Sequence, residues 1–343
     1  MIIICDRKLS AIEVAEPAKI LDLSLKLICV ALAIVLPSGQ VALAIDVWPH
    51  GHAVRVIVPY AAGSNTDAVG RSTASYLARA LPGSSFVVEN RPGTGGIIGT
   101  RAFIRSAADG YTLCVCSGGA ITVPSDVEKG YEPLKDLEPV SLISTSALVM
   151  IVNSQTPVKS VADVVAWSKA KKGGLSYGSS GTGGVMYNAA EIFRNRTGAV
   201  MIHVPFRGGP DATTALLSGD VDVVFAIMSD VLGQLQSKTV KPIAVTTPER
   251  SEILPDVPTM AEEGIQDYDV TLWNGLFVPV GTPAFIVNEL SRVLLKMAED
   301  EAARSTMLRF GSAVKVDTPA HFRAELALEV TRWDKYLKGM SRQ

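Results

Sequence analysis

The sequence has few of the residues that build metal and nucleic-acid sites. Only four cysteines and four histidines occur among 343 residues, and none are clustered at the spacing of a Cys/His metal site. Basic and acidic residues nearly balance, 32 against 34, and no basic run with interleaved aromatics is present, which argues against binding to nucleic acid. We therefore predict no metal, no cofactor and no nucleic-acid partner.

Motifs for nucleotide binding and serine hydrolysis are missing as well. The glycine cluster at 93–96 does not complete G-x-G-x-x-G, because Ile98 occupies the last glycine position, and no stretch matches a phosphate-binding P-loop. Ser179 and Ser180 lie in a glycine loop before a helix, as a nucleophilic serine would, but Thr182 stands where G-x-S-x-G requires its second glycine. No histidine has the sequence context of a general base. We predict that the protein is not an enzyme, and a secreted hydrolase is the alternative.

The amino-terminal segment has the composition of a leader. The apolar run 27–36 follows Lys26, and Ala42-Leu43-Ala44 provides a small-x-small cleavage site. This layout predicts a secretory signal peptide over residues 1–44, cleaved near Ala44. An uncleaved anchor and a buried core helix are the alternatives.

Cleavage would leave two cysteines, Cys114 and Cys116, in the stretch YTLCVCSGG. Their alternation places both side chains on one face of a predicted buried strand. A disulfide between residues i and i+2 would strain a strand. We therefore expect two buried free thiols.

One strand–loop–helix unit, residues 53–81, organises the first part of the chain. Val54, Val56 and Val58 share one strand face, apolar residues then recur at helical spacing from Val69, and the loop between them is rich in N-cap residues. The free amides at such a helix start form a binding site for an anion. The stretch 175–197 repeats this design.

The remaining pattern predicts two α/β layers. Strands and helices alternate along the chain, which favours parallel sheets. Two long apolar strands, Val140–Val152 and Tyr268–Pro279, are candidates for crossings between two lobes. Two similar anion-binding loops, over a hundred residues apart, then predict two lobes that close on one small acidic molecule.

Many stretches of the mature chain match one known family. They include VRVIVPYAAGSNTDAVGR, VVENRPGTGG, LSYGSSGTGG, HVPFRGGPDA, LPDVPTMAEEG and LWNGLFVPVGTP, and together they span nearly all of 46–343 in order. The chain resembles the Bug-type extracytoplasmic solute receptors of the tripartite tricarboxylate transporters.

This resemblance implies a type II periplasmic-binding-protein fold with two α/β lobes joined by two crossing strands. Residues 46–147 and 273–343 would form lobe 1, and residues 148–272 would form lobe 2. The protein would be a periplasmic monomer that captures a small organic acid by hinge closure and delivers it to large and small membrane subunits. A sensor that serves a signalling partner is the alternative.

The resemblance also implies which residues contact the ligand. The expected contacts lie in two loops of the first lobe and two of the second: Tyr60, Ala62, Gly63, Ser64, Asn65, Thr66, Asp67, Gly118, Gly119, Ser179, Ser180, Gly181, Thr182, Gly183, Phe206, Arg207 and Gly208.

Several positions depart from the family pattern. Relatives usually have Gly at Ser64, Lys at Arg207, often Asp at Ala226, and commonly His at Tyr187; the usual Thr-Ser opening of that helix is also replaced. These changes make the expected pocket more apolar, so a mono- or dicarboxylate, including an aromatic one, fits the pattern.

For some residues the sequence favours a structural role or leaves two interpretations open. His203 lies in an apolar strand and is expected to be a satisfied core residue, and Trp273 is expected to pack at the hinge. Asp67 either contacts ligand or stabilises its helix start, and Arg207 either pairs with a ligand carboxylate or is solvated at the cleft edge. The loop glycines either allow close approach of a ligand or form ordinary turns.

Overall fold

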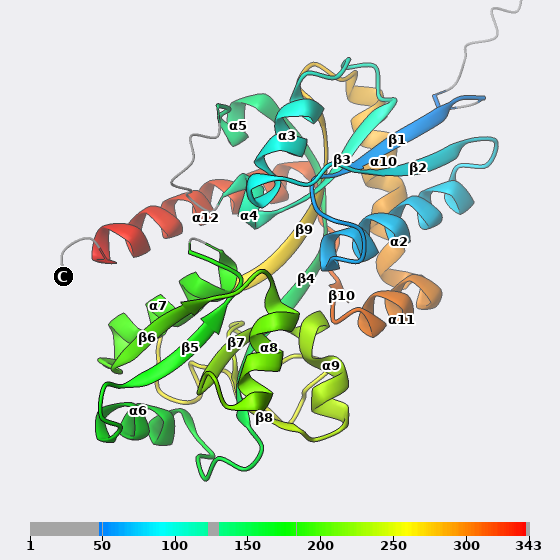
Figure 1. Cartoon of the computed structure of the whole chain (residues 1–343). Coiled ribbons are helices and arrows are strands. Elements are labelled where there is room, and N and C mark those ends of the chain that lie inside the picture. The colour runs from blue at the N-terminus through cyan, green and yellow to red at the C-terminus, as the bar shows by residue number, and fades with distance from the viewer. Residues whose placement is uncertain (1–47, 50, 123–129, 183, 341–343) are drawn as a thin grey trace, which may run out of the picture. The chain divides into compact units, whose positions relative to one another are not determined.

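The centre of the fold is a pair of long antiparallel strands, β4 (Leu137–Asn153) and β9 (Thr271–Pro279). They belong to a ten-stranded sheet with the order β2-β1-β3-β9-β4-β7-β5-β6, and β8 and β10 also pair with β4. The structure is a computed structural model that describes residues 48–49, 51–122, 130–182 and 184–340 (Figure 1). All of these residues belong to one compact unit, Trp48–Gln343.

Three parallel strands and their helices form what we call the first strand group. Strand β1 pairs with β2 on one side and with β3 on the other. The elements of this group are β1 (Ala53–Val58), α2 (Asn65–Ala80), β2 (Ser85–Asn90), η1 (Thr94–Gly96), α3 (Ile97–Ile104), β3 (Thr112–Ser117), α4 (Gly118–Ile121) and α5 (Pro133–Asp136).

The alternation of β1 sends its side chains into two separate cores. Val54, Val56 and Val58 are fully buried in one apolar cluster with residues of α2 and α10, whereas Ile57 belongs to another cluster with residues of α3 and α12. The predicted valine face is therefore confirmed. Helices cover both faces of this part of the sheet, as a parallel sheet requires.

A second strand group has its own apolar core. Its strands β5, β6 and β7 are parallel, and β7 and β8 pair antiparallel with the carboxyl-terminal half of β4. Its elements are α6 (Val161–Ala170), β5 (Leu175–Ser179), α7 (Val185–Thr197), β6 (Met201–Pro205), α8 (Gly209–Ser218), β7 (Val223–Ile227), α9 (Met228–Gln236) and β8 (Val240–Val245).

The carboxyl-terminal elements return to the first strand group. They are α10 (Ala284–Leu295), η2 (Lys296–Glu299), α11 (Glu301–Arg309), β10 (Ala313–Val314) and α12 (Pro319–Met340). Helix α12 contributes Phe322 and Leu326 to a core of the first group, and Trp333 to the core of the second. It is a third element, besides β4 and β9, that contacts both cores.

The carboxylate of Glu329 lies on α12 between the residues that contact the two cores. Glu329 accepts the indole N–H groups of Trp273 on β9 and Trp333 on α12. Burial raises the pKa of Glu329 to about 7, although the indole bonds and the charge of Arg332 act in the opposite direction. The predicted packing role of Trp273 is confirmed, because its ring is buried against Phe322.

The expectation for the cysteines is wrong. Cys114 and Cys116 are fully buried in β3 and form a disulfide with a Cα–Cα distance of 5.7 Å. Their side chains share one strand face, as predicted, and the Cα separation falls within the usual range for a disulfide. The objection based on strand geometry therefore does not hold here.

The predicted leader, residues 1–44, lies outside the described residues. Among the residues that the structure does describe, no helix is both long and apolar enough to cross a bilayer.

Candidate functional site

The carboxyl ends of the parallel strands form two edges that face each other along β4. In the first group, Ser117 at the end of β3 pairs with Asn274, which pairs in turn with Ser144. In the second group, Ile227 at the end of β7 pairs with Leu148. Ser144 and Leu148 are four residues apart on β4, about 13 Å at 3.3 Å per residue. The loops that follow the strands are where ligands bind in open α/β sheets.

Helix starts are concentrated at these two edges. Helix α2 follows β1, and α7, α8 and α9 follow β5, β6 and β7. Ser64 caps α2 by accepting the amide of Asp67 at 3.2 Å, but no side chain caps α7, α8 or α9 by a hydrogen bond. The first amides of a helix have no partner within it, and they carry the positive end of its dipole. The edges therefore favour negative groups.

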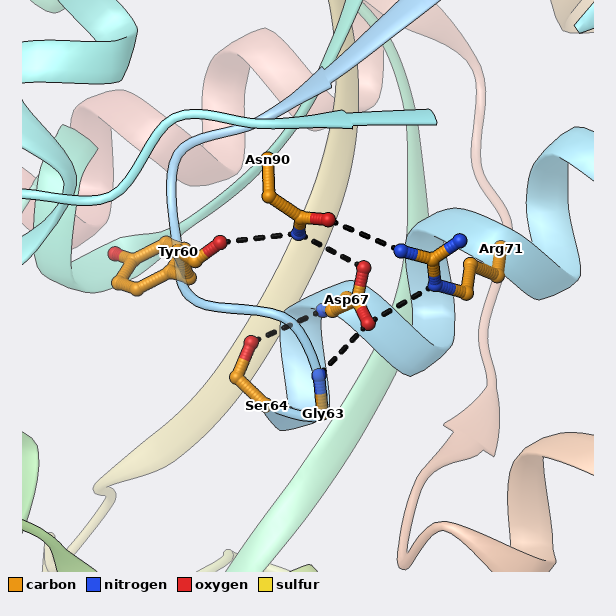
Figure 2. A network of polar contacts seen from close by, with 6 residues as sticks. All are labelled: Tyr60, Gly63, Ser64, Asp67, Arg71 and Asn90. Atoms are coloured by element: carbon orange, nitrogen blue, oxygen red, sulfur yellow. Dashed lines mark hydrogen bonds and ion pairs between the residues drawn. The ribbon is translucent and has the colours of Figure 1, made fainter. Parts of the chain in front are cut away.

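Asp67 faces its own loop rather than away from it (Figure 2). Its carboxylate accepts the amide of Gly63 at 2.9 Å, the side-chain amide of Asn90 at 2.9 Å and Nε of Arg71 at 3.0 Å. Burial alone would raise the pKa of Asp67, but the hydrogen bonds from Arg71, Gly63 and Asn90 together hold it below its usual value. This arrangement fits an internal anchor that fixes the loop between β1 and α2.

Tyr60 connects the first loop to its neighbours. Its hydroxyl accepts Ser117 Oγ–H at 2.7 Å, and its carbonyl accepts the side-chain amide of Asn90 at 3.1 Å. A Cβ on Gly96 or Gly119 would lie only 3.0 or 3.3 Å from this hydroxyl. Burial raises the pKa of Tyr60, so the phenol is neutral. The glycines at these two positions accommodate the ring between the loops.

The side chain of Asn65 points toward the crossing strands. It donates to the Phe310 carbonyl at 3.2 Å and to Ser312 Oγ at 3.0 Å, and it accepts from Asn274 Nδ2 at 3.1 Å. Asn274 also donates to Ser144 Oγ at 3.3 Å, while its own Oδ1 has no partner among the described residues. Asn65 is thus available to a ligand through its backbone amide more readily than through its side chain.

The other expected contacts in the first group differ in exposure. Ala62, Gly63 and Gly119 are exposed, whereas Thr66 and Gly118 are buried. A Cβ on Gly118 would lie 2.8 Å from Nε1 of Trp273, so glycine is required there by packing. Gly63 has open space around it and a φ of +83°, which supports the turn interpretation at this position.

In the second group, Ser179 and the residues after it form a compact turn. Ser179 is fully buried, and its Oγ accepts the amide of Gly181 at 3.1 Å and lies 2.7 Å from Nε2 of His203. Ser180 and Thr182 are exposed. Gly181 has a φ of +112°, and a Cβ added there would meet no atom within 4 Å, so backbone conformation again explains the glycine.

Gly183 lies outside the described residues. The neighbouring loop is joined to this turn, because the amide of Phe206 donates to the Ser179 carbonyl at 2.8 Å. Arg207 is exposed, and Gly208 is the N-cap of α8. The expected residues of the second group that the structure describes therefore lie at one edge of the sheet.

His203 has a hydrogen-bond partner, as expected, but it is not the fully buried core residue that its apolar strand predicts. It is half-buried, bonds to Ser179, stacks on Tyr177 with ring centroids 5.1 Å apart, and meets the edge of Tyr187 at 4.8 Å. Burial lowers the pKa of His203, which favours the neutral imidazole, although the charge of Glu191 acts in the opposite direction. Sequence reasoning missed the pairing because the two residues are 24 positions apart.

Asp230 is a further carboxylate that sequence reasoning did not identify. It lies in the first turn of α9, and its Oδ2 is 2.0 Å from where a Cβ on Gly209 would be. Burial raises the pKa of Asp230, and a hydrogen bond from Ser229 opposes this only partly. Asp230 and Gly209 are far apart in the sequence, and no local pattern predicts that they lie close together in the fold.

A separate groove of about 740 Å³ lies away from these loops. It is lined by α6, the end of α7 and residues 263–267. Its polar rim is already occupied in part, since Arg196 donates to the Gln266 carbonyl and Glu263 accepts the amide of Val161. Within the described part of the chain, no group of three or more metal-binding side chains occurs.

The fold and the two facing edges of helix starts define an α/β solute-binding protein. A family model described as "Tripartite tricarboxylate transporter family receptor" matches residues 69–338. The chain belongs to this family of solute-binding receptors, as the sequence resemblance predicts.

Relatives of known sequence and structure agree with this assignment. Protein BugT of Bordetella pertussis is 33% identical over 291 residues, which cover 84% of this chain and 89% of BugT. An R. palustris protein solved with adipate is 29% identical, with a TM-score of 0.77 and coverage of 85% and 98%. MatC from Rhodopseudomonas palustris, solved with bound malate, is 28% identical, with a TM-score of 0.72 and coverage of 83% and 98%.

Proposed function

We propose that this protein captures a small carboxylate between two lobes and delivers it to the membrane subunits of a tripartite tricarboxylate-type transporter. Lobe 1 would comprise 46–147 and 273–343, and lobe 2 would comprise 148–272. The division is supported by the separate apolar cores of the two strand groups, which are joined through β4 and β9. The protein would act as a periplasmic monomer after removal of residues 1–44.

The observation that carries this proposal is the concentration of helix starts at two facing strand edges. Each helix end contributes about 0.3–1 kcal/mol to anion binding, and roughly 2 kcal/mol when partly buried. Micromolar affinity requires about 8 kcal/mol. Helix ends alone are therefore insufficient, and hydroxyls such as those of Ser180 and Thr182, together with Arg207, would supply direct hydrogen bonds.

The ligand class is a mono- or dicarboxylate. Malate and adipate are present in solved relatives, and the loops of this chain offer backbone amides and hydroxyls that can bind a carboxylate. Asp67 is already bonded within the chain, so we assign it to loop support rather than to ligand contact. The amide of Gly63 already donates to Asp67, so Gly63 would contact the ligand only through its other atoms.

A thermal-shift screen of the purified protein tests the proposal. The panel would contain acetate, malate, adipate, citrate, benzoate and glutamate, with adipamide as the uncharged match for adipate. A ligand at about 100 times its Kd stabilises the native state by about 2.7 kcal/mol. A dose-dependent rise with a carboxylate, and none with adipamide, is expected. No rise with any acid would contradict the proposed ligand class.

The hydrolase alternative is weakened by the environment of Ser179. Its hydroxyl is buried and already bonded to the Gly181 amide, although His203 lies within hydrogen-bonding distance. The carboxylate of Glu191 accepts hydrogen bonds from Tyr177 and Arg194, so it is already occupied and does not act as the acid of a Ser–His–acid triad. Delivery to a signalling partner instead of a transporter is the remaining alternative; loss of carboxylate uptake on deletion of this gene would favour transport.

A further inference from the structure

We propose that His203 is a positioning residue that holds the turn at residues 179–182 in shape for anion binding by fixing the hydroxyl of Ser179. The inference rests on the proposed function for its purpose, but the contacts that carry it lie within the protein. Nothing in the loop sequence alone links His203, on β6, to Ser179, at the end of β5.

The Ser179 hydroxyl has three polar groups within hydrogen-bonding distance. A serine hydroxyl has one proton to donate and two lone pairs. Ser179 Oγ lies 2.7 Å from His203 Nε2, 3.1 Å from the Gly181 amide and 3.3 Å from the Gly181 carbonyl. Oγ has a lone pair for the Gly181 amide whether its proton goes to His203 or to the Gly181 carbonyl. Its shortest contact is to Nε2 of His203, so the imidazole fixes the position from which Oγ accepts the Gly181 amide.

The imidazole itself is held from two elements. His203 pairs in register with Tyr177 of β5, whose ring stacks on it, and Tyr187 of α7 contacts its edge. The Tyr177 hydroxyl donates to Glu191 at 2.7 Å, and Glu191 accepts from Arg194 at 2.6 Å, but the contact of Tyr177 with His203 is made by its ring. The half-buried ring is neutral, because burial lowers its pKa more than Glu191 raises it. A neutral ring can hydrogen-bond to Ser179 at Nε2 in either tautomer, as acceptor or as donor.

The consequence concerns which loop groups a ligand can use. The Gly181 amide is turned inward to Ser179, so it supports the loop and does not meet the anion. The exposed Ser180 and Thr182, and the amides at the start of α7, are left for the ligand. His203 thus acts on the ligand through Ser179 and makes no contact of its own.

Amide hydrogen exchange at Gly181, measured by NMR on the purified protein without ligand, tests this role. Ser179→Ala and His203→Phe should each speed exchange by about tenfold, as expected for loss of one net hydrogen bond. His203→Gln places a side-chain amide near the Nε2 position and should restore most of the protection. Tyr177→Phe is the matched control: it removes the bond to Glu191 from the same cluster but leaves the Ser179–His203 contact.

Three results would overturn the proposal. They are unchanged Gly181 exchange in His203→Phe, equal acceleration in Tyr177→Phe, and failure of His203→Gln to protect better than His203→Phe. If a variant does not fold, the wild-type protein still decides, because its ring-nitrogen spectrum should show Nε2 of His203 in a hydrogen bond with Ser179. A ring whose Nε2 makes no hydrogen bond would contradict the inference.

A binding measurement extends the test to function. With adipate as the probe in titration calorimetry, His203→Phe should weaken binding by about tenfold, equivalent to one lost hydrogen bond, and His203→Gln should bind nearly as tightly as wild type. Equal affinity in His203→Phe and wild type would show that the loop does not need His203. If adipate fails to bind wild type, adipate is excluded as the ligand, while the exchange result still decides the role of His203.

Discussion

Replacing Asp67 tests whether its carboxylate supports the first loop or serves the ligand. In Asp67→Ala, the amide of Gly63 and the side-chain amide of Asn90 lose an acceptor at 2.9 Å. The bond from Arg71 contributes less, because the Arg71 side chain is 54% exposed. A hydrogen bond to a charged group contributes about 1.5–3 kcal/mol. Because water can satisfy part of the lost bonds in the opened loop, we expect the free energy of unfolding to fall by about 2–4 kcal/mol.

The assay is thermal unfolding of the purified variants. At about 2.1 cal/mol/K of unfolding entropy per residue, a protein of roughly 300 residues shifts by about 1.6 °C per kcal/mol, so Asp67→Ala should unfold roughly 3–6 °C below wild type. Asp67→Asn, which keeps one oxygen acceptor, should lie between them. The control is Asp211→Ala, which removes an exposed aspartate from the first turn of α8 and should shift the midpoint by no more than about 2 °C, since a helix-dipole contact is worth up to about 1 kcal/mol.

The pH dependence of this difference follows from the sign of the pKa shift. The pKa of Asp67 is lower in the folded protein than its usual 3.8. Its stabilisation is therefore complete above the unfolded value and is lost as the pH falls below 3.8 through the folded value. Asp67→Ala and wild type should converge in strong acid. A wild-type midpoint for Asp67→Ala at about pH 7, together with lost carboxylate binding, would refute the supporting role and favour direct ligand contact.

Three other experiments test separate features. Glu329→Gln should stabilise the protein at about pH 8 but hardly at about pH 5. The reason is that the pKa of Glu329 is raised from 4.5 to about 7 on folding, so the wild-type protein loses at most about 3 kcal/mol of stability as the pH rises between those values, and the variant does not. Thermal unfolding at both pH values should show this difference, and an equal effect at both would contradict it. Gly181→Glu should bind carboxylate at least about tenfold more weakly than Gly181→Gln, which has the same backbone strain but no charge. A like-charge repulsion of about 1.4 kcal/mol is enough for a tenfold difference. Equal affinities in calorimetry would exclude an anion near this loop. Peptide mapping without reductant should find Cys114 linked to Cys116, and two free thiols there would disprove the disulfide.

The sequence was most informative where periodicity and loop chemistry reinforce each other. The strand face of Val54, Val56 and Val58, the start of α2 after a loop of N-cap residues, and the long strand through 140–152 all follow from local pattern. These features depend on residues close together in the chain. The family match then agrees with the overall α/β assignment.

Local pattern could not predict contacts between distant segments. Asn65 meets Phe310 and Asn274, more than two hundred residues away, and no periodicity reveals such a partner. The hydrogen bond between His203 and Ser179 was not predicted, because a residue in an apolar strand is usually a core residue. The disulfide was missed because the argument from ideal strand geometry ignored the 5.7 Å Cα separation that this strand attains.

A crystal structure of the protein with the carboxylate that gives the largest thermal shift tests the central claim most directly. We predict one anion between the amides that begin α2 and the Ser180–Thr182 turn, with the two strand groups on either side of it. A carboxylate bound instead in the groove of α6 and residues 263–267, or held by one strand group alone, would contradict capture between two facing edges.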